Sequence, residues 1–478
     1  MKTGSDYLGR LRYSAEDWSA AAGPLGDHGP NRGVTVLIPT YTSTEGDRTA
    51  CLRQCLDSVL TAPRPDHQPI AFVVVDNGLS PAAARQVAEM LRGSGCAHRV
   101  VQAVSARSGR YTAAEARNAG LAMLAELPDT SDLRQRHLLF LDDDTALEQH
   151  ALARLTAVLR AEQAAIAACP RVVPVADLAA WRAAHVKGRH CAGEGPSAWA
   201  ARQLPGPLID AGYDLLSVTA YGSLITGRTV GLLVRQDPVM RWIGRHGPLF
   251  YTGTPYGSCE DILAMATLSR LGQLWSVPAA TVADEARKSP GATRRQQFAW
   301  GYDHAWLARR LAQAGLLGDG VRALSWTAQS ACPTAGWEFG HADWGGPIGC
   351  LVNPGELRFG YQLLQAVISS PRVATQLFGG QAEAVSAGTA QLGRVLDRWD
   401  SSREAARQQP RPDLPPLGNR DWSSLRDGLD ALIGHLAGNV AGSWGNGVGA
   451  AGIPPFFLYG TRQPAADLGR PCPGGRRK

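Results

Sequence analysis

Hydrophobic residues form short, nearly uninterrupted runs in the first part of the chain. Apolar and β-branched residues dominate five of them, at residues 34–40, 71–77, 99–105, 137–144 and 164–175, the fourth of which ends in three aspartates. Runs that lack an alternation of polar positions are typical of strands buried on both faces of a sheet. We therefore expect these five segments to be buried strands.

Signals for helices lie between these runs. Asp47 is a candidate N-cap for an amphipathic helix that contains residues 51–60. Ser80 precedes Pro81, a common helix start, and Thr112 begins a capping-box sequence, TAAE. Strands that alternate with helices form βαβ units, so the pattern predicts an α/β fold with a parallel sheet. Ligands of such sheets bind beyond the carboxyl ends of the strands.

The later part of the chain has a different pattern. We expect a strand over residues 221–235, a helix over 261–271, a strand to about residue 282 and a helix over 294–315. Beyond residue 316 a Gly/Trp-rich stretch is followed by amphipathic helical patterns and a Gly-rich tail. These changes predict three parts, which are an N-terminal arm (1–32), an α/β domain (33–315) and a mainly helical C-terminal domain (316–478).

Composition and charge exclude several classes of protein. The chain has 478 residues, of which 44% are hydrophobic and 19% charged, as in globular rather than disordered proteins. The net charge of +6 is small and no segment concentrates basic residues, so we expect no nucleic-acid partner. No run reaches the roughly 18 apolar residues of a transmembrane helix, and the first 30 residues lack the apolar core of a secretory signal. We expect a soluble, cytoplasmic protein without a transmembrane segment.

Three consecutive carboxylates, Asp142, Asp143 and Asp144, end the run at residues 137–144. They repel one another unless a cation neutralises them, and a hard divalent cation with oxygen ligands is the natural partner. Because alternate residues of an extended strand point to the same side, Asp142 and Asp144 can face one side together. The alternative is an acidic turn that caps the next helix, a role that needs one carboxylate.

A second pair of carboxylates, Glu260 and Asp261, begins a helix after the glycine-rich loop at residues 253–257. The helix N-terminus favours negative charge, and a carboxylate there can serve as a general base if it reaches a substrate hydroxyl. The alternative is an ordinary acidic first turn of a helix.

A third charged cluster begins at Asp284 and continues into several basic residues, among them Arg294 and Arg295. Such cations can neutralise a diphosphate. The alternative is a basic helix face in contact with solvent.

Taken in order, these motifs resemble the family 2 glycosyltransferases with the GT-A fold. The motifs that carry the resemblance are VLIPTY (36–41), the helix 51–60, VVDNG (74–78), ARNAGL (116–121), Asp142-x-Asp144 and Glu260–Asp261. Each motif is weak alone, but the ordered set over about residues 33–310 is specific. The resemblance implies a Rossmann-like, mixed, mostly parallel sheet with helices on both faces, followed by the mainly helical C-terminal domain.

The resemblance also implies a reaction and its cofactor. A sugar would move from a nucleotide-diphosphate sugar, expected to be a UDP-sugar, to an acceptor hydroxyl with inversion of the anomeric centre, and Mn²⁺ or Mg²⁺ would be the cofactor. The expected nucleotide-binding residues are Pro39, Thr40, Tyr41, Asp76, Arg117, Asp142 and Asp143. Within this set, Asp76 would accept a hydrogen bond from the base and Arg117 would lie against it.

The remaining roles follow from the same resemblance. Asp144 and Asp142 match the metal-binding pair, Asp261 matches the general base with Glu260 beside it, and Arg294 and Arg295 are expected at the diphosphate.

Two departures from the family pattern affect the expected site. Many relatives have a histidine as a further metal ligand after the strand that follows the base helix, whereas residues 282–285 here read VADE. Either Asp284 takes its place or the metal has fewer protein ligands. The Q-x-x-R-W motif of processive synthases is also incomplete, because QQFAW (296–300) has alanine in the arginine position. With no transmembrane segment either, we do not expect a membrane polymerase.

Two other classes of function stay open. A nucleotidyltransferase that makes nucleotide-sugars shares the α/β layout, but it needs a glycine-rich, arginine-containing phosphate loop after the first strand, which TSTEG (42–46) is not. An inactive sugar-nucleotide-binding protein would keep the pocket and lose carboxylates, whereas Asp142, Asp144 and Asp261 are all present. The acceptor is unknown, and we expect a soluble one such as a natural product, a peptide or a glycan end. We also expect the C-terminal helices to pack on the α/β domain and help to shape the acceptor site.

Overall fold

The structure is a computed structural model of the chain. It describes residues 33–40, 48–63, 68–103, 112–186, 229–258, 260–285, 290–313, 361–362, 364–404, 434, 436–438 and 440–442. The elements of its first half are β1 (Val34–Thr40), α3 (Arg48–Leu60), β2 (Ile70–Asp76), α4 (Pro81–Gly93), β3 (Ala97–Gln102), α5 (Ala113–Glu126), β4 (His137–Phe140), β5 (Thr145–Leu147), α6 (Ala151–Ala161), β6 (Ala165–Val175) and α7 (Leu178–Val186). Those of its second half are β7 (Leu233–Arg235), α10 (Gln236–His246), α11 (Glu260–Leu271), β8 (Gln273–Glu285), α12 (Pro290–Gln313), α15 (Pro371–Phe378), η4 (Gly379–Gln381) and α16 (Ala382–Glu404).

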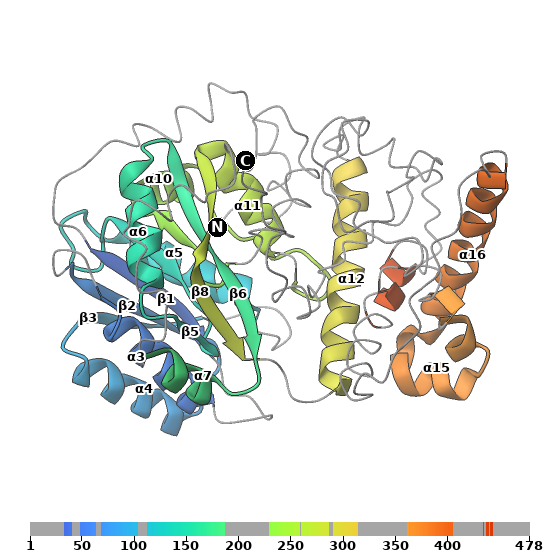
Figure 1. The fold of residues 1–478 in the computed structure, drawn as a ribbon, viewed down its shortest axis with the longest axis horizontal. Coiled ribbons are helices and arrows are strands. Elements are labelled where there is room, and N and C mark those ends of the chain that lie inside the picture. The colour runs from blue at the N-terminus through green and yellow to red at the C-terminus, as the bar shows by residue number, and fades with distance from the viewer. Residues whose placement is uncertain are drawn as a thin grey trace, which may run out of the picture.

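The described strands form one eight-stranded sheet in the order β3-β2-β1-β4-β7-β6-β8-β5 (Figure 1). The pairs β1–β2, β2–β3, β1–β4 and β6–β8 are parallel, whereas β4–β7, β6–β7 and β5–β8 are antiparallel. The expected mixed, mostly parallel sheet is therefore confirmed. It has the Rossmann-like arrangement that the family resemblance implied.

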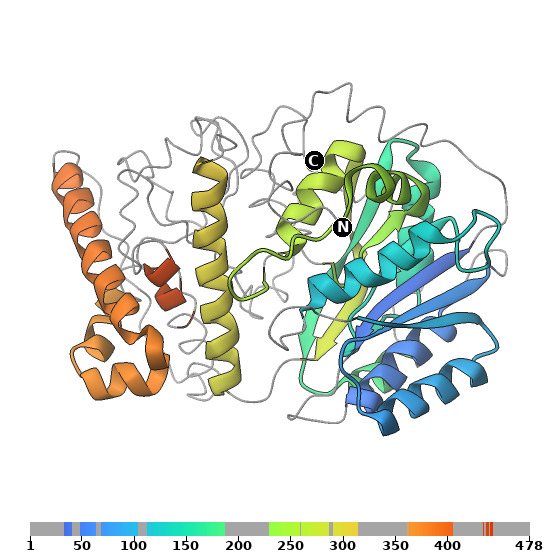
Figure 2. The ribbon, with the colours of Figure 1, turned by 180° about the vertical axis from the view of Figure 1, so that it is seen from behind.

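Helices cover both faces of the sheet, as Figures 1 and 2 show from opposite sides. Alternate residues of β1 enter different cores, because successive side chains of a strand point to opposite faces. Leu37 packs in a cluster with residues of α5, α10 and α11. Val36 and Ile38 pack in a second cluster with residues of α3, α4 and α6. All three side chains are fully buried, as the uninterrupted apolar run predicted.

Three expected strands differ from the observed ones. β3 is only partly buried, because among the described strands it pairs with β2 alone and forms an edge of the sheet. β4 ends at Phe140 rather than continuing through Asp144. The chain turns at the aspartates, where the backbone N–H and the hydroxyl of Thr145 donate to the carbonyl oxygen of Asp142 at 3.2 and 2.7 Å. Asp142 and Asp144 therefore lie in a turn and not on an extended strand. Of the strand expected over 221–235, only residues 233–235 form a strand, β7. Residues 229–232 contain a turn instead, and residues 221–228 lie outside the described part.

Two helix starts are confirmed in detail. The Ser80 hydroxyl accepts a hydrogen bond from the Ala83 N–H, with Pro81 in the first turn of α4. The Thr112 hydroxyl accepts from the Glu115 N–H at 3.2 Å, which is one half of a capping box. Asp47, the expected cap of α3, lies outside the described residues. The expected helix over 261–271 is α11, and the one over 294–315 is α12, which begins four residues earlier.

Helix α12 lies between the sheet and the C-terminal helices (Figure 1). Phe298 and Tyr302 of α12 share a hydrophobic cluster with buried residues of α15, α16 and the segment 434–442. Glycines of that segment lie directly on the α12 backbone, since a Cβ at Gly438 would overlap the Phe298 carbonyl oxygen. The boundary that we place at residues 315 and 316 stays a prediction. Within the described residues, no helix combines the length and the apolar character that crossing a membrane requires.

Candidate active site

The carboxyl ends of β1, β2 and β4 meet at one edge of the sheet. Thr40 lies opposite Asp76 in the register of β1 and β2, and the Asn77 N–H donates to the Thr40 carbonyl oxygen at 2.8 Å. The Thr40 hydroxyl donates to Oδ2 of Asp143 at 2.8 Å, which joins β1 to the turn after β4. Asp143 is almost fully buried in this contact. The sheet therefore brings three predicted nucleotide-binding positions together.

Arg117 of α5 connects the two carboxylate motifs. Its guanidinium lies 2.5 Å from Oδ1 of Asp142 and 2.8 Å from Oε1 of Glu260, and its side chain is only 3% exposed. Burial alone would lower the pKa of Arg117, but Asp142, Glu260 and the nearby Asp261 outweigh it and raise that pKa above its ordinary value. The aspartate turn and the start of α11, far apart in the sequence, are thus joined by one cation.

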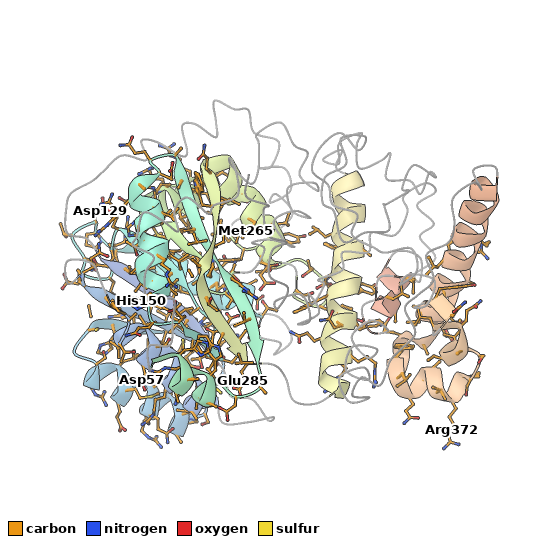
Figure 3. All side chains as sticks on the ribbon, viewed as in Figure 1. Asp57, Asp129, His150, Met265, Glu285 and Arg372 are labelled. Carbon is orange, nitrogen blue, oxygen red and sulfur yellow. The ribbon has the colours of Figure 1, made fainter. Side chains whose placement is uncertain are left out.

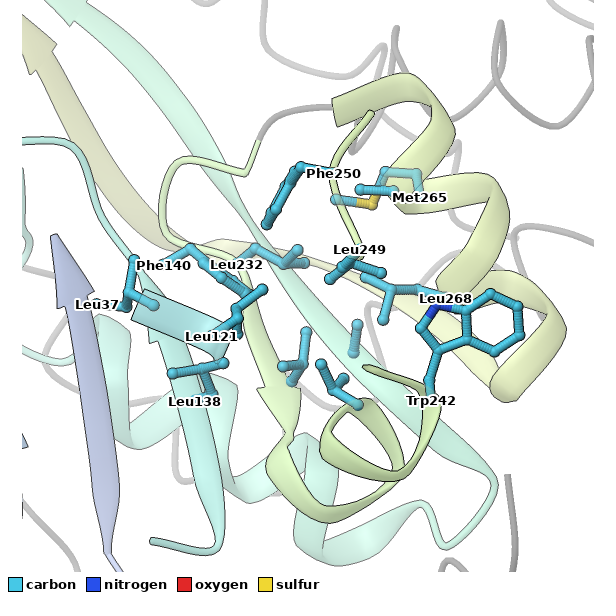
Figure 4. Packing of buried hydrophobic residues seen from close by; sticks show 14 of the residues in the cluster. Leu37, Leu121, Leu138, Phe140, Leu232, Trp242, Leu249, Phe250, Met265 and Leu268 are labelled. Atoms are coloured by element: carbon cyan, nitrogen blue, oxygen red, sulfur yellow. The ribbon is translucent and has the colours of Figure 1, made fainter. Parts of the chain in front are cut away.

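The neighbour of Arg117, Asn118, holds the chain that leads toward α11. Its side-chain amide donates to the Phe250 carbonyl oxygen at 2.7 Å and accepts from the Phe250 N–H at 3.0 Å. The Phe250 ring packs edge-on against Phe140 at 5.5 Å between ring centroids, and Figure 4 shows this contact beside α11. The Arg117 guanidinium lies 5.5 Å from the centre of the same ring. Phe250 therefore links the end of β4 with the site cation.

Glu260 and Asp261 begin α11, as the sequence predicts. The Glu260 side chain is 14% exposed and is paired with Arg117. Asp261 is half-buried and close enough to Arg117 to raise its pKa. The two consecutive carboxylates therefore have different surroundings, which is a condition for different chemical roles.

Asp284 lies beside the aspartate turn. Antiparallel pairing of β5 with β8 puts Asp284 opposite Thr145, and the Glu285 N–H donates to the Asp144 carbonyl oxygen at 3.0 Å. Glu285, labelled in Figure 3, also accepts a hydrogen bond from the Cys51 thiol of α3 at 3.0 Å. Strand β8, which contains no histidine, thus places Asp284 beside the aspartate turn.

Negative charge accumulates around this turn. Burial raises the pKa of the Cys55 thiol, and Asp143, Asp142 and Asp144 raise it further. The donor groups are carboxylate oxygens, which suit Mg²⁺ or Mn²⁺. Among the described residues, no three or more His, Cys, Asp and Glu side chains are arranged as a metal site. The charge and the donor chemistry fit a hard cation, although the side chains do not form a closed coordination shell.

The remaining predicted residues are placed as follows. Asp76 accepts from the N–H groups of Gly78 and Leu79 through Oδ1, at 3.0 and 2.7 Å. Arg294 is half-buried on α12 and packs against the segment 434–442, and Arg295 is exposed. Tyr41 lies outside the described residues. Pro39 is buried in β1, opposite Val75.

One residue of this region, Asp303, was not predicted. It is fully buried on α12 and accepts hydrogen bonds from Tyr256 and Ser258, in the loop before Glu260. Burial raises its pKa, and the hydrogen bonds from Ser258 and Tyr256 oppose that rise. The signal in the sequence was that Asp303 is the sole acidic residue between Pro290 and Gln313.

The comparison with family models agrees with the sequence motifs. A family model described as glycosyltransferase like family 2 matches residues 30–303, which is more than half of the chain. Among solved structures, residues 1–349 of S. aureus TarS are 15% identical, with 81% of this chain and 95% of that chain covered and a TM-score of 0.36. The mannosyltransferase PcManGT from Pyrobaculum calidifontis, in complex with GDP-Man and Mn²⁺, is 16% identical, with 93% and 95% covered and a TM-score of 0.41. No curated protein matches the sequence.

Proposed function

The chain belongs to the glycosyltransferase like family 2 and is a glycosyltransferase, and we propose that it transfers a sugar from a nucleotide-diphosphate sugar to an acceptor hydroxyl with inversion. The observation that carries this proposal is the double ion pair of Arg117 with Asp142 and Glu260. It joins the turn expected to hold the diphosphate to the carboxylates expected to act on the acceptor. The family assignment removes the nucleotidyltransferase alternative.

The donor half of the site lies at the ends of β1 and β2 and in the aspartate turn. Thr40 and Asp76 would line the nucleotide pocket, with a UDP-sugar as the expected donor. Asp142, Asp144 and Asp284 would hold Mn²⁺ or Mg²⁺, because their oxygens suit a hard cation and the backbone of β8 pairs with the chain directly after the aspartate turn. When bound, the cation supplies positive charge that offsets the charge of the departing diphosphate.

The acceptor half of the site lies at the start of α11. Asp261 would take the proton of the acceptor hydroxyl as that oxygen attacks the anomeric carbon. Glu260 is engaged by Arg117, so we assign it to positioning. One displacement with one base inverts the anomeric centre, and the bond to the nucleotide diphosphate breaks as the new glycosidic bond forms.

A donor-hydrolysis assay tests this proposal, with water in place of the acceptor. The full chain is incubated with Mn²⁺ and UDP-glucose, UDP-N-acetylglucosamine or GDP-mannose, and release of nucleoside diphosphate is measured. Asp261→Asn keeps the shape of the side chain but accepts no proton, so turnover should fall by about 10²- to 10⁴-fold. Calorimetric donor affinity should change little, because the donor contacts come from other elements.

Glu260→Gln is the matched variant. If it abolishes turnover while Asp261→Asn does not, the base is assigned to the wrong carboxylate. If both variants turn over normally, the base lies elsewhere. If the unmodified chain releases diphosphate from none of the donors, the chain is an inactive binding protein or uses a different donor class, and the proposed reaction is contradicted.

A further inference from the structure

The loop that precedes Glu260 is attached to helix α12 by one buried carboxylate. Oδ1 of Asp303 accepts the backbone N–H of Tyr256 at 3.0 Å, and Oδ2 accepts the backbone N–H and the hydroxyl of Ser258 at 2.9 and 2.6 Å. Every hydrogen bond to Asp303 within the described part of the chain comes from residues 254–258. A charged acceptor makes such bonds stronger than neutral ones.

The same loop also holds itself in a tight turn. The Thr254 hydroxyl donates to the Ser258 carbonyl oxygen at 2.9 Å. Gly257 has a φ of 71°, and a Cβ there would overlap the Thr112 side chain. Thr112 is the N-cap of α5, the helix that carries Arg117. The loop is thus fitted between α12 on one side and the start of α5 on the other.

Aromatic contacts add to the attachment. The Tyr256 ring packs edge-on against Tyr302 and Phe298 of α12, with ring centroids 5.1 and 5.9 Å apart. Both aromatic residues of α12 also belong to the cluster that contains α15, α16 and the segment 434–442. The position of the loop therefore depends on α12, which is itself packed against the C-terminal helices.

We propose that Asp303 is a positioning residue, which fixes the loop 254–258 on α12 and thereby determines the position of Asp261 relative to the donor. This inference rests on the proposed role of Asp261 as the base. Two residues separate Ser258 from Asp261, so a shift of the loop is passed directly to the start of α11. A displacement of about 1 Å in a catalytic group can cost about 10²-fold in rate.

Asp303→Asn and Ser258→Ala test the proposal in the full chain. Asparagine keeps one oxygen acceptor but puts an NH₂ group, which cannot accept, in place of the second oxygen. Ser258→Ala removes the hydroxyl donor and leaves both backbone N–H donors in place. In the donor-hydrolysis assay with Mn²⁺ and the preferred nucleotide-sugar, we expect turnover to fall by about 10- to 10²-fold for Asp303→Asn. We expect a smaller loss for Ser258→Ala, because one bond of the three is removed.

Leu91→Ala is the control for loss of stability. Leu91 is a fully buried residue of α4, in the cluster that contains no residue of α11 or α12, so its truncation destabilises the fold without disturbing the loop or the helix that holds it. It should lower the melting temperature but keep turnover per folded molecule. Donor affinity, measured by calorimetry with Mn²⁺, should stay within twofold of the unmodified chain in all three variants.

Hydrogen–deuterium exchange gives a readout that does not depend on activity. The amides of Tyr256 and Ser258 should exchange faster in Asp303→Asn and Ser258→Ala, and their exchange should be unchanged in Leu91→Ala. Full turnover in Asp303→Asn, or an equal loss of turnover in Leu91→Ala, would overturn the positioning role. Asp261→Asn is measured alongside. If Asp261→Asn keeps its turnover, the proposed base is wrong and this inference falls with it. If Asp261→Asn is inactive and Asp303→Asn is normal, the positioning role alone is wrong.

Discussion

Arg117 and Asp303 are both buried charges, and they are compensated in different ways. Arg117 is neutralised by two carboxylates at ion-pair distance, whereas Asp303 is solvated by N–H and hydroxyl donors of one loop. Removing one partner of a buried charge costs about 3–5 kcal/mol, because the other charge is left without compensation. This is why asparagine, which keeps an acceptor, is a sharper probe of Asp303 than alanine.

His137 of β4 is a third buried polar residue, and it makes folding stability depend on pH. Burial lowers its pKa to about 3, and Arg136, Arg235 and Arg160 lower it in the same direction. The unfolded chain takes up this proton near pH 6.5, whereas the folded chain stays neutral down to about pH 3. Between these values the unfolded state binds more protons, so the free energy of unfolding should fall by about 1.4 kcal/mol per pH unit as the pH is lowered.

His137→Leu tests this linkage. Neither ring nitrogen of His137 has a hydrogen-bond partner among the described residues, so an apolar side chain of similar size costs little. Urea unfolding of the variant between pH 4.5 and 7.5 should show a shallower dependence on pH than that of the unmodified chain. His150→Gln, at an exposed histidine, is the control. Equal slopes for the unmodified chain and His137→Leu would contradict the prediction.

Turnover should need a divalent cation, and Asp144→Ala should remove this Mn²⁺-dependent turnover. The variant should stay folded, because relief of repulsion within the aspartate turn offsets a lost turn contact of about 1 kcal/mol. Calorimetric titration of Mn²⁺ in the presence of UDP should show weaker binding than in the unmodified chain. Asp132→Ala, at an exposed aspartate that precedes β4 and lies outside the turn, is the control. Full activity of Asp144→Ala in EDTA would exclude the metal role.

At the scale of elements, the N-cap of α5 matters for both stability and the site. The Thr112 hydroxyl satisfies the Glu115 N–H, and α5 carries Arg117 and Asn118. Thr112→Ala should lower the free energy of unfolding by about 1 kcal/mol, because the first turn of the helix loses its acceptor. Thr112→Ser keeps the hydroxyl. Its free energy of unfolding in urea should therefore stay within about 0.5 kcal/mol of that of the unmodified chain. An equal loss in both variants would show that the methyl group against Gly257 matters more than the cap.

The elements themselves could be predicted closely where hydrophobicity alone determines them. Residues 34–40 and 71–77 were expected as strands, and Val34–Thr40 and Ile70–Asp76 are observed, since both strands are buried on both faces. The end of β4 was missed, because Leu141 extends the apolar run past the point where the chain turns. β7 is only three residues long and lies antiparallel between β4 and β6, which a local pattern cannot predict.

At the scale of the whole molecule, the candidate site was predictable only one motif at a time. The aspartates at 142–144 were found because they end an apolar run, and Glu260 and Asp261 were found because they begin a helix after a glycine-rich loop. Their partners were not, because Arg117 and Glu260 are 143 residues apart and Asp303 reaches its loop across 45 residues. Those contacts depend on how α5, α11 and α12 pack, and no short stretch of sequence contains that information. The order of the motifs indicated the family, and the geometry of the site required the structure.

The C-terminal segment 434–442 meets α12 through glycines spaced four apart. Gly434, Gly438 and Gly442 lie on the α12 backbone at Arg294, Phe298 and Tyr302, so the two backbones approach more closely than a Cβ would permit. Tyr302 and Phe298 in turn contact Tyr256 of the loop before Glu260. The C-terminal segment and the loop 254–258 therefore both pack against α12.

Gly438→Ala should accordingly affect stability and turnover together. Its Cβ would overlap the Phe298 carbonyl oxygen, which is backbone and cannot rotate away, so we expect a loss of about 1–3 kcal/mol in the free energy of unfolding. Turnover should fall while donor affinity is kept, as for Asp303→Asn, because α12 moves and the loop moves with it. Gly380→Ala is the matched control, since a Cβ there meets nothing within 4 Å and should leave both quantities unchanged. If Gly438→Ala has the same free energy of unfolding and the same turnover as Gly380→Ala, the C-terminal segment does not support α12. If it loses stability but keeps turnover, the segment stabilises the fold without positioning the base.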